Sequence, residues 1–177
     1  MHVPQPHPDR LTEIAGHPVV VGVVPSQDAL VALTAASLAR AAAASVHFAF
    51  VDTSRYVERE FADGDVDHRP ISPDASGDEW RTTDSRLRSE IAAAMADTGV
   101  EWRFHYLAGR IDRALTHLAR AVDAGVIVLG AQHAGMGTRM HEFFEGSVAL
   151  RLTHHQHRPV LVVPLRVTDW KDEPAWR

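Results

Sequence analysis

The chain has 177 residues, of which 45% are hydrophobic and 23% charged, and its net charge is −5. These values are ordinary for one soluble globular domain, and a mildly acidic balance gives no overall electrostatic footprint for nucleic acid or for an anionic membrane. No cysteine is present, which excludes disulfides, thiolate metal sites and cysteine nucleophiles and suits the reducing cytoplasm.

The first half of the chain alternates between strand and helix patterns. Residues 1–17 are polar and proline-rich, so we expect a loose arm, and they lack the pattern of a signal peptide. The apolar, β-branched run over 18–24 predicts a strand buried on both faces. An alanine-rich helix is predicted over 27–44, with Ser26 as its N-cap and with Leu30, Leu33 and Leu38 on its inner face. A second strand is expected over 45–52.

Residues 52–80 form a long charged segment without a sustained period, for which we expect an irregular surface excursion. A helix over 83–97 and a strand over 100–107 should follow, the strand having a wetter face that carries Arg103 and His105. The remaining predicted elements are a helix after Gly109-Arg110, a buried strand over 126–129, a helix over 146–155, a last strand over 159–163 and a charged tail over 165–177.

This order predicts an α/β fold over 18–164: a single doubly wound, mostly parallel five-stranded sheet with helices on both faces. No apolar segment is long enough to cross a bilayer. Such sheets bind ligands beyond the carboxyl ends of their strands, at the topological switch point. The turns near Ser26, Asp52, Arg110 and Gly130 should therefore share one rim.

The most informative stretch is "GAQHAGMGTRMHEFFEGSV", residues 130–148, which follows a buried strand and opens a helix. Strand, glycine-rich loop and helix N-terminus is an arrangement that often holds phosphate. Gly146-Ser147 is the strongest candidate, although Ser147 could simply cap its own helix. The full set of candidate nucleotide or phosphate residues is Ser26, Arg110, Gly130, His133, Gly135, Gly137, Thr138, Arg139, Gly146 and Ser147. The alternatives are a flexible loop, solvated arginines and a space-filling His133.

Metal sites and catalysis find little support. His141-Glu142 begins like a zinc-peptidase motif, but Glu145 occupies the place of the second histidine. His154, His155 and His157 precede the last strand, on the rim opposite the candidate site, where a surface role is favoured over a metal site. Asp63, Asp65 and Asp67 lack the glycine and glutamate of a calcium loop and are interpreted as solvated acids. No metal and no catalytic residue is predicted; fold analogy alone suggests at most a slow nucleotide hydrolase.

The segment "VIVLGAQHAGMGTRMHEFFEGSVALRLTHHQHRPVLVVP" resembles the universal stress protein family, and the resemblance extends over 18–164. It is carried by the V-I-V-x-G strand, the glycine-rich loop, Gly146-Ser147, the histidine-rich turn and the final P-V-L-V-V. The resemblance implies an adenine-nucleotide α-hydrolase-like sheet, a cytoplasmic stress-response role, and a homodimer formed through Val160, Leu161, Val162 and Val163. It also implies ATP or AMP as the ligand in the branch of the family that binds nucleotide.

Two departures separate this chain from that branch. The branch is marked by a glycine, two residues, a glycine, nine residues and then Gly-Ser or Gly-Thr. Here His133 occupies the second glycine position, and ten residues separate Gly135 from Gly146. Val24 stands where the family usually has an aspartate that contacts the nucleoside. The sequence therefore favours a degenerate cleft without tight ATP binding; the alternative is a genuine ATP- or AMP-binding regulator.

Overall fold

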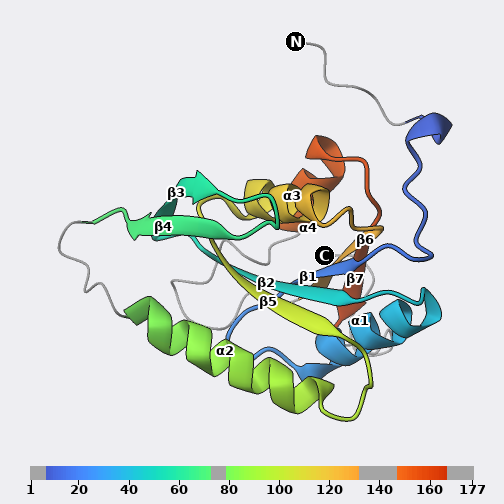
Figure 1. Ribbon diagram of the computed structural model, residues 1–177, viewed down its shortest axis with the longest axis horizontal. Helices are drawn as coiled ribbons and strands as arrows, with labels where there is room; N and C mark the ends of the chain where they lie inside the picture. Colours follow the sequence, from blue (N-terminus) through green and yellow to red (C-terminus); the bar gives the residue numbers. More distant parts are fainter. Residues whose placement is uncertain (1–6, 73–78, 132–146, 167–177) are drawn as a thin grey trace, which may run out of the picture.

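The computed structural model describes residues 7–72, 79–131 and 147–166. Five strands form one parallel sheet in the order β5-β2-β1-β6-β7 (Figure 1). These strands are β1 (Val19–Gly22), β2 (Val46–Asp52), β5 (Trp102–Ala108), β6 (Val126–Ala131) and β7 (Val160–Pro164). Neighbouring strands run in register, with Val19 opposite both Val46 and Val126. The predicted α/β fold with a five-stranded parallel sheet is confirmed.

Helices cover both faces of the sheet. The helices α1 (Ala29–Ala41) and α2 (Glu79–Met95) lie on one face, and α3 (Ile111–Ala121) and α4 (Ser147–His155) lie on the other (Figure 1). Each face has its own apolar core, centred on Phe48 and Leu87 on the first and on Leu115 and Leu152 on the second. Strand β1 is buried on both faces, as its unbroken valine run predicts.

Helix α1 differs from its prediction at its start and in its buried face. Asp28, not Ser26, is the N-cap, since its Oδ1 accepts a hydrogen bond from the backbone N–H of Leu30 at 2.8 Å. Leu30 and Leu33 are each 46% exposed. The buried face instead carries Val31, Ala32, Ala35, Ala36 and Ala39. Small side chains allow the helix to approach a sheet that is already lined with valine, so the larger leucines turn outward.

The predicted irregular excursion contains a β-hairpin, β3 (Arg55–Glu60) with β4 (Val66–Pro70), paired antiparallel. This hairpin packs beside β5, the end strand of the sheet, and α2 begins at Glu79, before the predicted start at residue 83. The hairpin explains a second correction. His105, predicted on a wetter face of β5, is 1% exposed, and its Nδ1 lies 2.5 Å from Oδ1 of Asp65 in the hairpin turn. Asp65 is therefore not simply a solvated acid.

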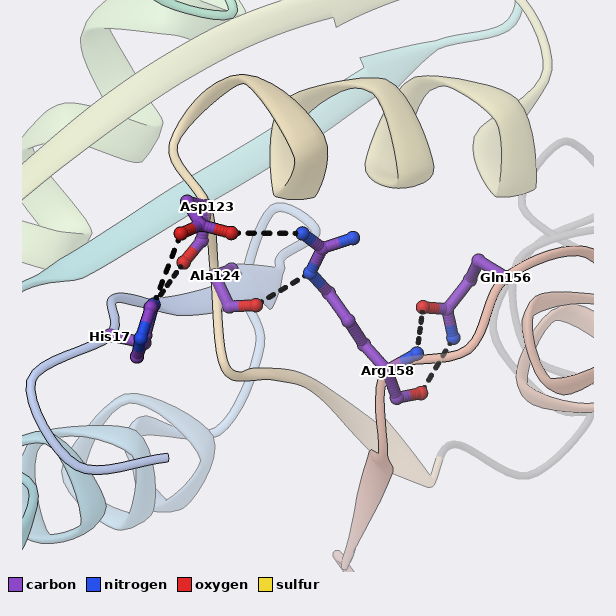
Figure 2. A network of polar contacts seen from close by, with 5 residues as sticks. All are labelled: His17, Asp123, Ala124, Gln156 and Arg158. Atoms are coloured by element: carbon purple, nitrogen blue, oxygen red, sulfur yellow. Dashed lines mark hydrogen bonds and ion pairs between the residues drawn. The ribbon is translucent and has the colours of Figure 1, made fainter. Parts of the chain in front are cut away.

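Three segments that are distant in sequence meet at the amino end of the sheet, around Arg158 (Figure 2). The buried Arg158 guanidinium donates through Nε to the carbonyl of Ala124 at 2.5 Å, and its Nη2 lies 3.4 Å from Oδ1 of Asp123. His17 contacts the Asp123 carbonyl at 2.9 Å, and Gln156 bonds both the N–H and the carbonyl of Arg158. This network joins the N-terminal segment, the α3–β6 loop and the α4–β7 turn, opposite the rim where a ligand is expected.

A final correction concerns the N-terminal arm. Residues 8–10 form a single 3₁₀ turn, η1 (Pro8–Arg10), and the N–H of Gly16 donates to the carbonyl of Ala42 at 2.7 Å. Gly16 and His17, at the end of the arm, are therefore held against the domain rather than loose.

Candidate functional site

The topological switch point lies between β1 and β6, because the chain adds β2 and β5 on one side of β1 and then β6 and β7 on the other. All five strands are parallel, so their carboxyl ends lie at the same edge. Ser26 follows β1 and Gly130 lies near the end of β6, next to the switch point. Asp52 and Arg110 follow β2 and β5 and lie further along this rim. The predicted common rim is thus present.

Gly130 is needed for close packing. A Cβ at this position would lie 2.7 Å from Nε2 of Gln27, 2.9 Å from Cγ2 of Val31 and 3.2 Å from Cδ1 of Leu165. The start of α1 therefore rests directly on the backbone of β6. Gly130 was predicted as a phosphate contact, and the structure supplies a steric reason for this glycine that needs no ligand.

Ser26 is tied to helix α2. Its backbone N–H donates to Oε2 of Glu90 at 3.0 Å, and Nη2 of Arg86 donates to its Oγ. Arg86 and Glu90 also pair with each other, with Nε and Oε1 at 2.8 Å. Ser26 has a φ of 60°, a left-handed conformation that turns the chain sharply after β1. The Ser26 N–H donates to Glu90 and its hydroxyl oxygen accepts from Arg86, so both groups already have a partner within the protein, and only the hydroxyl proton is not used by these two bonds.

Val24 is buried and faces only a small cavity. It is 2% exposed and, together with Val23, lines a cavity of about 60 Å³ between α1 and α2. The rest of the cavity wall is Gln27, Asp28, Ala29, Ala32, Leu87, Glu90, Ile91 and Ala94. A space of this size holds a few water molecules and not a nucleoside.

Asp52, at the end of β2, is fully engaged. Its Oδ2 accepts a hydrogen bond from the Tyr106 hydroxyl at 2.8 Å, and its Oδ1 accepts from the N–H and the hydroxyl of Ser54 at 2.9 and 2.6 Å. Burial, together with the hydrogen bond to Asp52, raises the pKa of the Tyr106 hydroxyl well above its ordinary value. Tyr106 therefore stays protonated and keeps donating to this carboxylate, which closes the β2 end of the rim.

Arg110, a predicted phosphate contact, pairs instead with Asp112 in the first turn of α3. Nη2 of Arg110 lies 2.8 Å from Oδ2 of Asp112, whose side chain is 6% exposed. Burial alone would raise the pKa of Asp112, but the hydrogen bond and charge of Arg110 outweigh it and hold the pKa below its usual value. The Arg110 side chain is 70% exposed, and no hydrogen bond or ion pair in the described ranges joins it to Ser26.

Six of the candidate residues lie outside the described residues: His133, Gly135, Gly137, Thr138, Arg139 and Gly146. Ser147 is the first residue of α4, and α4 begins at the carboxyl rim. Its backbone N–H therefore belongs to the first turn of that helix, where intrahelical acceptors are missing. The predicted placement of Ser147 at a helix start next to the switch point agrees with the structure.

Sequence reasoning missed three residues at this site: Gln27, Arg86 and Glu90. The i, i+4 spacing of Arg86 and Glu90 signals an ion pair on a helix surface. Nothing local indicates that this pair reaches Ser26, which is 60 residues earlier than Arg86. Nε2 of Gln27 is buried and has no hydrogen-bond partner in the part of the chain that the structure describes.

Across residues 7–72, 79–131 and 147–166, no group of three or more histidine or acidic side chains is arranged to hold a metal ion. Within the same residues, the longest apolar helical stretch falls short of what a membrane crossing needs. His154, His155 and His157 are exposed at the end of α4 and in the turn that follows it.

The arrangement at the rim matches a known family. The family model described as "Universal stress protein family" matches residues 16–164. The chain belongs to the universal stress protein family. The five-stranded parallel sheet, the switch point between β1 and β6 and the start of α4 after the glycine-rich stretch are the features that this membership accounts for.

Solved structures with the same fold come from this family. A universal stress protein from Archaeoglobus fulgidus is 20% identical, with a TM-score of 0.59 over 84% of this chain and 94% of that one. A structure of the universal stress protein from Archaeoglobus fulgidus in complex with dAMP is 22% identical, with a TM-score of 0.56 over 85% of this chain and 99% of that one. A universal stress protein in complex with cAMP is 21% identical, with a TM-score of 0.55 over 86% and 99% of the two chains. At these identities the likeness shows the fold. A search of curated proteins found no match.

Proposed function

We propose that this universal stress protein acts in the cytoplasmic stress response as a homodimer, with a degenerate nucleotide cleft that does not bind ATP tightly. The observation that carries the cleft assignment is the engagement of Ser26. Its N–H and its hydroxyl, the polar groups nearest the switch point, are both bonded to the Arg86–Glu90 pair of α2. Family membership supports the stress-response role, and the absence of cysteine suits the cytoplasm.

Electrostatics and desolvation both oppose nucleotide binding at this end of the cleft. Glu90 places a carboxylate at the Ser26 N–H, where it would repel an incoming phosphate, and its pairing with Arg86 ties up the guanidinium that could otherwise attract one. A ligand that took over the Ser26 groups would break hydrogen bonds to charged partners that are partly exposed, each worth roughly 1 kcal/mol. One such loss weakens binding by about fivefold. Val24 and Pro25 offer no polar side chain in compensation.

Calorimetric titration with ATP and with AMP tests this proposal. We expect no saturation below about millimolar nucleotide, whereas a Kd in the micromolar range for the folded wild-type chain would overturn it. Glu90→Gln removes the carboxylate charge but keeps its shape, so it should strengthen any residual binding severalfold. The matched control is Glu101→Gln, an exposed residue just before β5 at the opposite rim.

The alternative is a genuine ATP- or AMP-binding regulator. The neighbours in complex with dAMP and with cAMP support it, because those proteins share this fold. It predicts micromolar binding that Gly146→Val abolishes, together with a nucleotide-dependent change in oligomer or partner affinity. A slow nucleotide hydrolysis would additionally require phosphate release that Gly146 and Ser147 substitutions remove.

The homodimer is proposed through β7, an end strand of the sheet. Leu161 is 39% and Val162 44% exposed, while Val163 is 5% exposed and packs in the core. The apolar contact should therefore come from Leu161 and Val162 rather than from the whole run. An exposed apolar end strand is a liability unless another chain covers it.

Sedimentation velocity tests the dimer. Val162→Lys places a charge in the proposed interface and should convert the dimer to monomer without loss of the folded state. Leu150→Lys is the matched control, since Leu150 is 58% exposed on α4. A wild-type chain that sediments as a monomer at about 100 μM would contradict the proposal.

A further inference from the structure

A groove runs between the β3–β4 hairpin and α3, on the α3 side of the carboxyl end of β5 and away from the switch point between β1 and β6. It consists of two adjoining hollows of about 440 and 410 Å³. The hollows share Glu60, Arg110, Arg113 and His117, so they are continuous along α3. Each hollow falls in the volume range typical of small-molecule sites. Figure 1 shows the hairpin and α3 side by side above the sheet.

The two hollows differ in chemistry. The first has an apolar part formed by Tyr56, Val66, Leu107 and Ala114, and its remaining wall includes the charged residues Glu58, Arg59, Glu60, Arg110 and Arg113. The second carries three arginines, Arg110, Arg113 and Arg120, against two acidic residues, Glu60 and Asp112, so it is basic on balance. Arg113, His117 and Arg120 are spaced four and three residues apart, so they lie on one face of α3. From Arg113 to Arg120 the helix advances about 10 Å, comparable to the length of a small organic molecule.

The positive charge of the basic hollow is neutralised only in part. Arg110 is paired with Asp112, and Oε2 of Glu60 lies 3.5 Å from Nδ1 of His117. Arg113 and Arg120, by contrast, are exposed and have no ion pair within the described ranges.

Further cations lie near Arg120, although they do not line the groove. The pKa of His157, which is exposed, is lowered by desolvation and then by the charges of Arg158, Arg10 and Arg120. Asp123, next to Arg158, is already engaged by Arg158 and His17. A chain with a net charge of −5 thus carries a local excess of positive charge at this point. Anions are the ligands that such an excess attracts.

We propose that this groove binds a small organic anion, with its phosphate or carboxylate at Arg113 and Arg120 and its apolar body against Tyr56, Val66 and Leu107. Guanidinium groups suit this role because their planar donors match the oxygens of both anions. The groove borders the carboxyl rim at Arg110, which lines both hollows, but Ser26, Val24 and Gly130 are not among its lining residues.

The test uses 1-naphthyl phosphate as the probe. Its binding to the full chain is measured by calorimetry and by the fluorescence of the naphthalene ring. We expect one probe to bind per chain, at least tenfold more tightly than either inorganic phosphate or neutral 1-naphthol, because each of these lacks one half of the interaction. Arg113→Ala with Arg120→Ala should weaken probe binding at least tenfold. The matched control is Arg40→Ala with Arg88→Ala, which removes the same charge from α1 and α2 on the other face of the sheet.

Three outcomes would overturn the proposal. The first is equal binding to wild type and to the Arg113/Arg120 double variant, with both folded by circular dichroism. The second is equal loss in the Arg40/Arg88 variant, which would indicate general electrostatic attraction. The third is inorganic phosphate binding as tightly as the probe, which would show that apolar contacts with the naphthalene ring contribute nothing to binding. Glu90→Gln should leave probe binding unchanged, so failure here is distinguishable from failure of the nucleotide proposal.

Discussion

Single residues at the carboxyl rim show why a glycine or a serine in a family motif needs a structural explanation before a functional one. Gly130 lacks a side chain because α1 rests on it, and Ser26 is held by two residues of α2. Both positions were predicted to contact phosphate. In each case the contacts that the fold already makes are sufficient to account for the residue.

Gly130→Ala tests this packing. The added Cβ would be far closer to Gln27 and Val31 than real contacts allow, so we expect a loss of roughly 1–3 kcal/mol in the free energy of unfolding. Urea denaturation measures it. Val31→Ala removes one of the clashing atoms, so the double variant should lose less than the sum of the two single variants. If the losses of the two single variants simply add in the double variant, the strain of Gly130→Ala is relieved somewhere other than at Val31.

His47 should make stability depend on pH. Its Nδ1 lies 2.9 Å from Nε2 of His105. Burial, then the charges of His105 and Arg103, lower the pKa of His47 to about 4 from an ordinary 6.5. The unfolded chain therefore binds the proton first, and the stability held above pH 6.5 falls as pH drops toward 4. Between pH 7 and pH 5 we expect a loss of roughly 1–2 kcal/mol in the free energy of unfolding.

Urea denaturation of His47→Asn at the two pH values checks this expectation. Asparagine keeps a donor near the position of Nδ1 but cannot titrate, so the pH dependence should flatten. His154→Asn, on the exposed end of α4, should keep the wild-type dependence. If His47→Asn retains the full dependence, another group is responsible.

At the level of elements, the β3–β4 hairpin covers the exposed edge of β5 and touches both faces of the domain. Gly64 in its turn lies against Leu118 of α3, and His68 of β4 packs edge-on against Trp80 of α2, with ring centroids 4.9 Å apart. End strands need such protection against pairing with other chains. The opposite end strand, β7, has no comparable cover within the described residues.

Gly64→Ala should loosen the hairpin. Gly64 has a φ of 91°, and a Cβ there would lie 2.5 Å from Cδ1 of Leu118. Gly99→Ala is a matched control, because Gly99 also has a positive φ, 65°, but has nothing within 4 Å. Both should lose about 1 kcal/mol from backbone strain, and Gly64→Ala roughly 1–3 kcal/mol more. Hydrogen exchange should quicken over residues 55–70 only in Gly64→Ala; equal effects in both variants would dismiss the packing term.

Across the whole molecule, the two ends of the sheet differ in what they contain. At the amino end, the Arg158 network joins three segments from the start, middle and end of the chain (Figure 2). The carboxyl end carries the turns at the switch point.

Arg158→Met should destabilise the entire domain rather than one element. It leaves the buried Ala124 carbonyl without its donor, so we expect a loss of roughly 2 kcal/mol in a single cooperative unfolding transition. Arg120→Met, at an exposed position of α3, is the control and should change stability by less than about 0.5 kcal/mol. Chemical denaturation followed by two optical probes checks both; an unchanged midpoint for Arg158→Met would contradict the role of the network.

The sequence by itself determined the order of elements, the parallel sheet, the buried strands and the family. These follow from local signals: β-branched apolar runs, helical periodicity and the glycine-rich stretch after Val126–Ala131. Tertiary structure alone decided which face of α1 is buried, that residues 55–70 form a hairpin over His105, and that Ser26 is bound by Arg86 and Glu90. The physical reason is that these contacts join residues tens of positions apart, so no local period records them, and only packing selects among faces that the pattern leaves nearly equivalent.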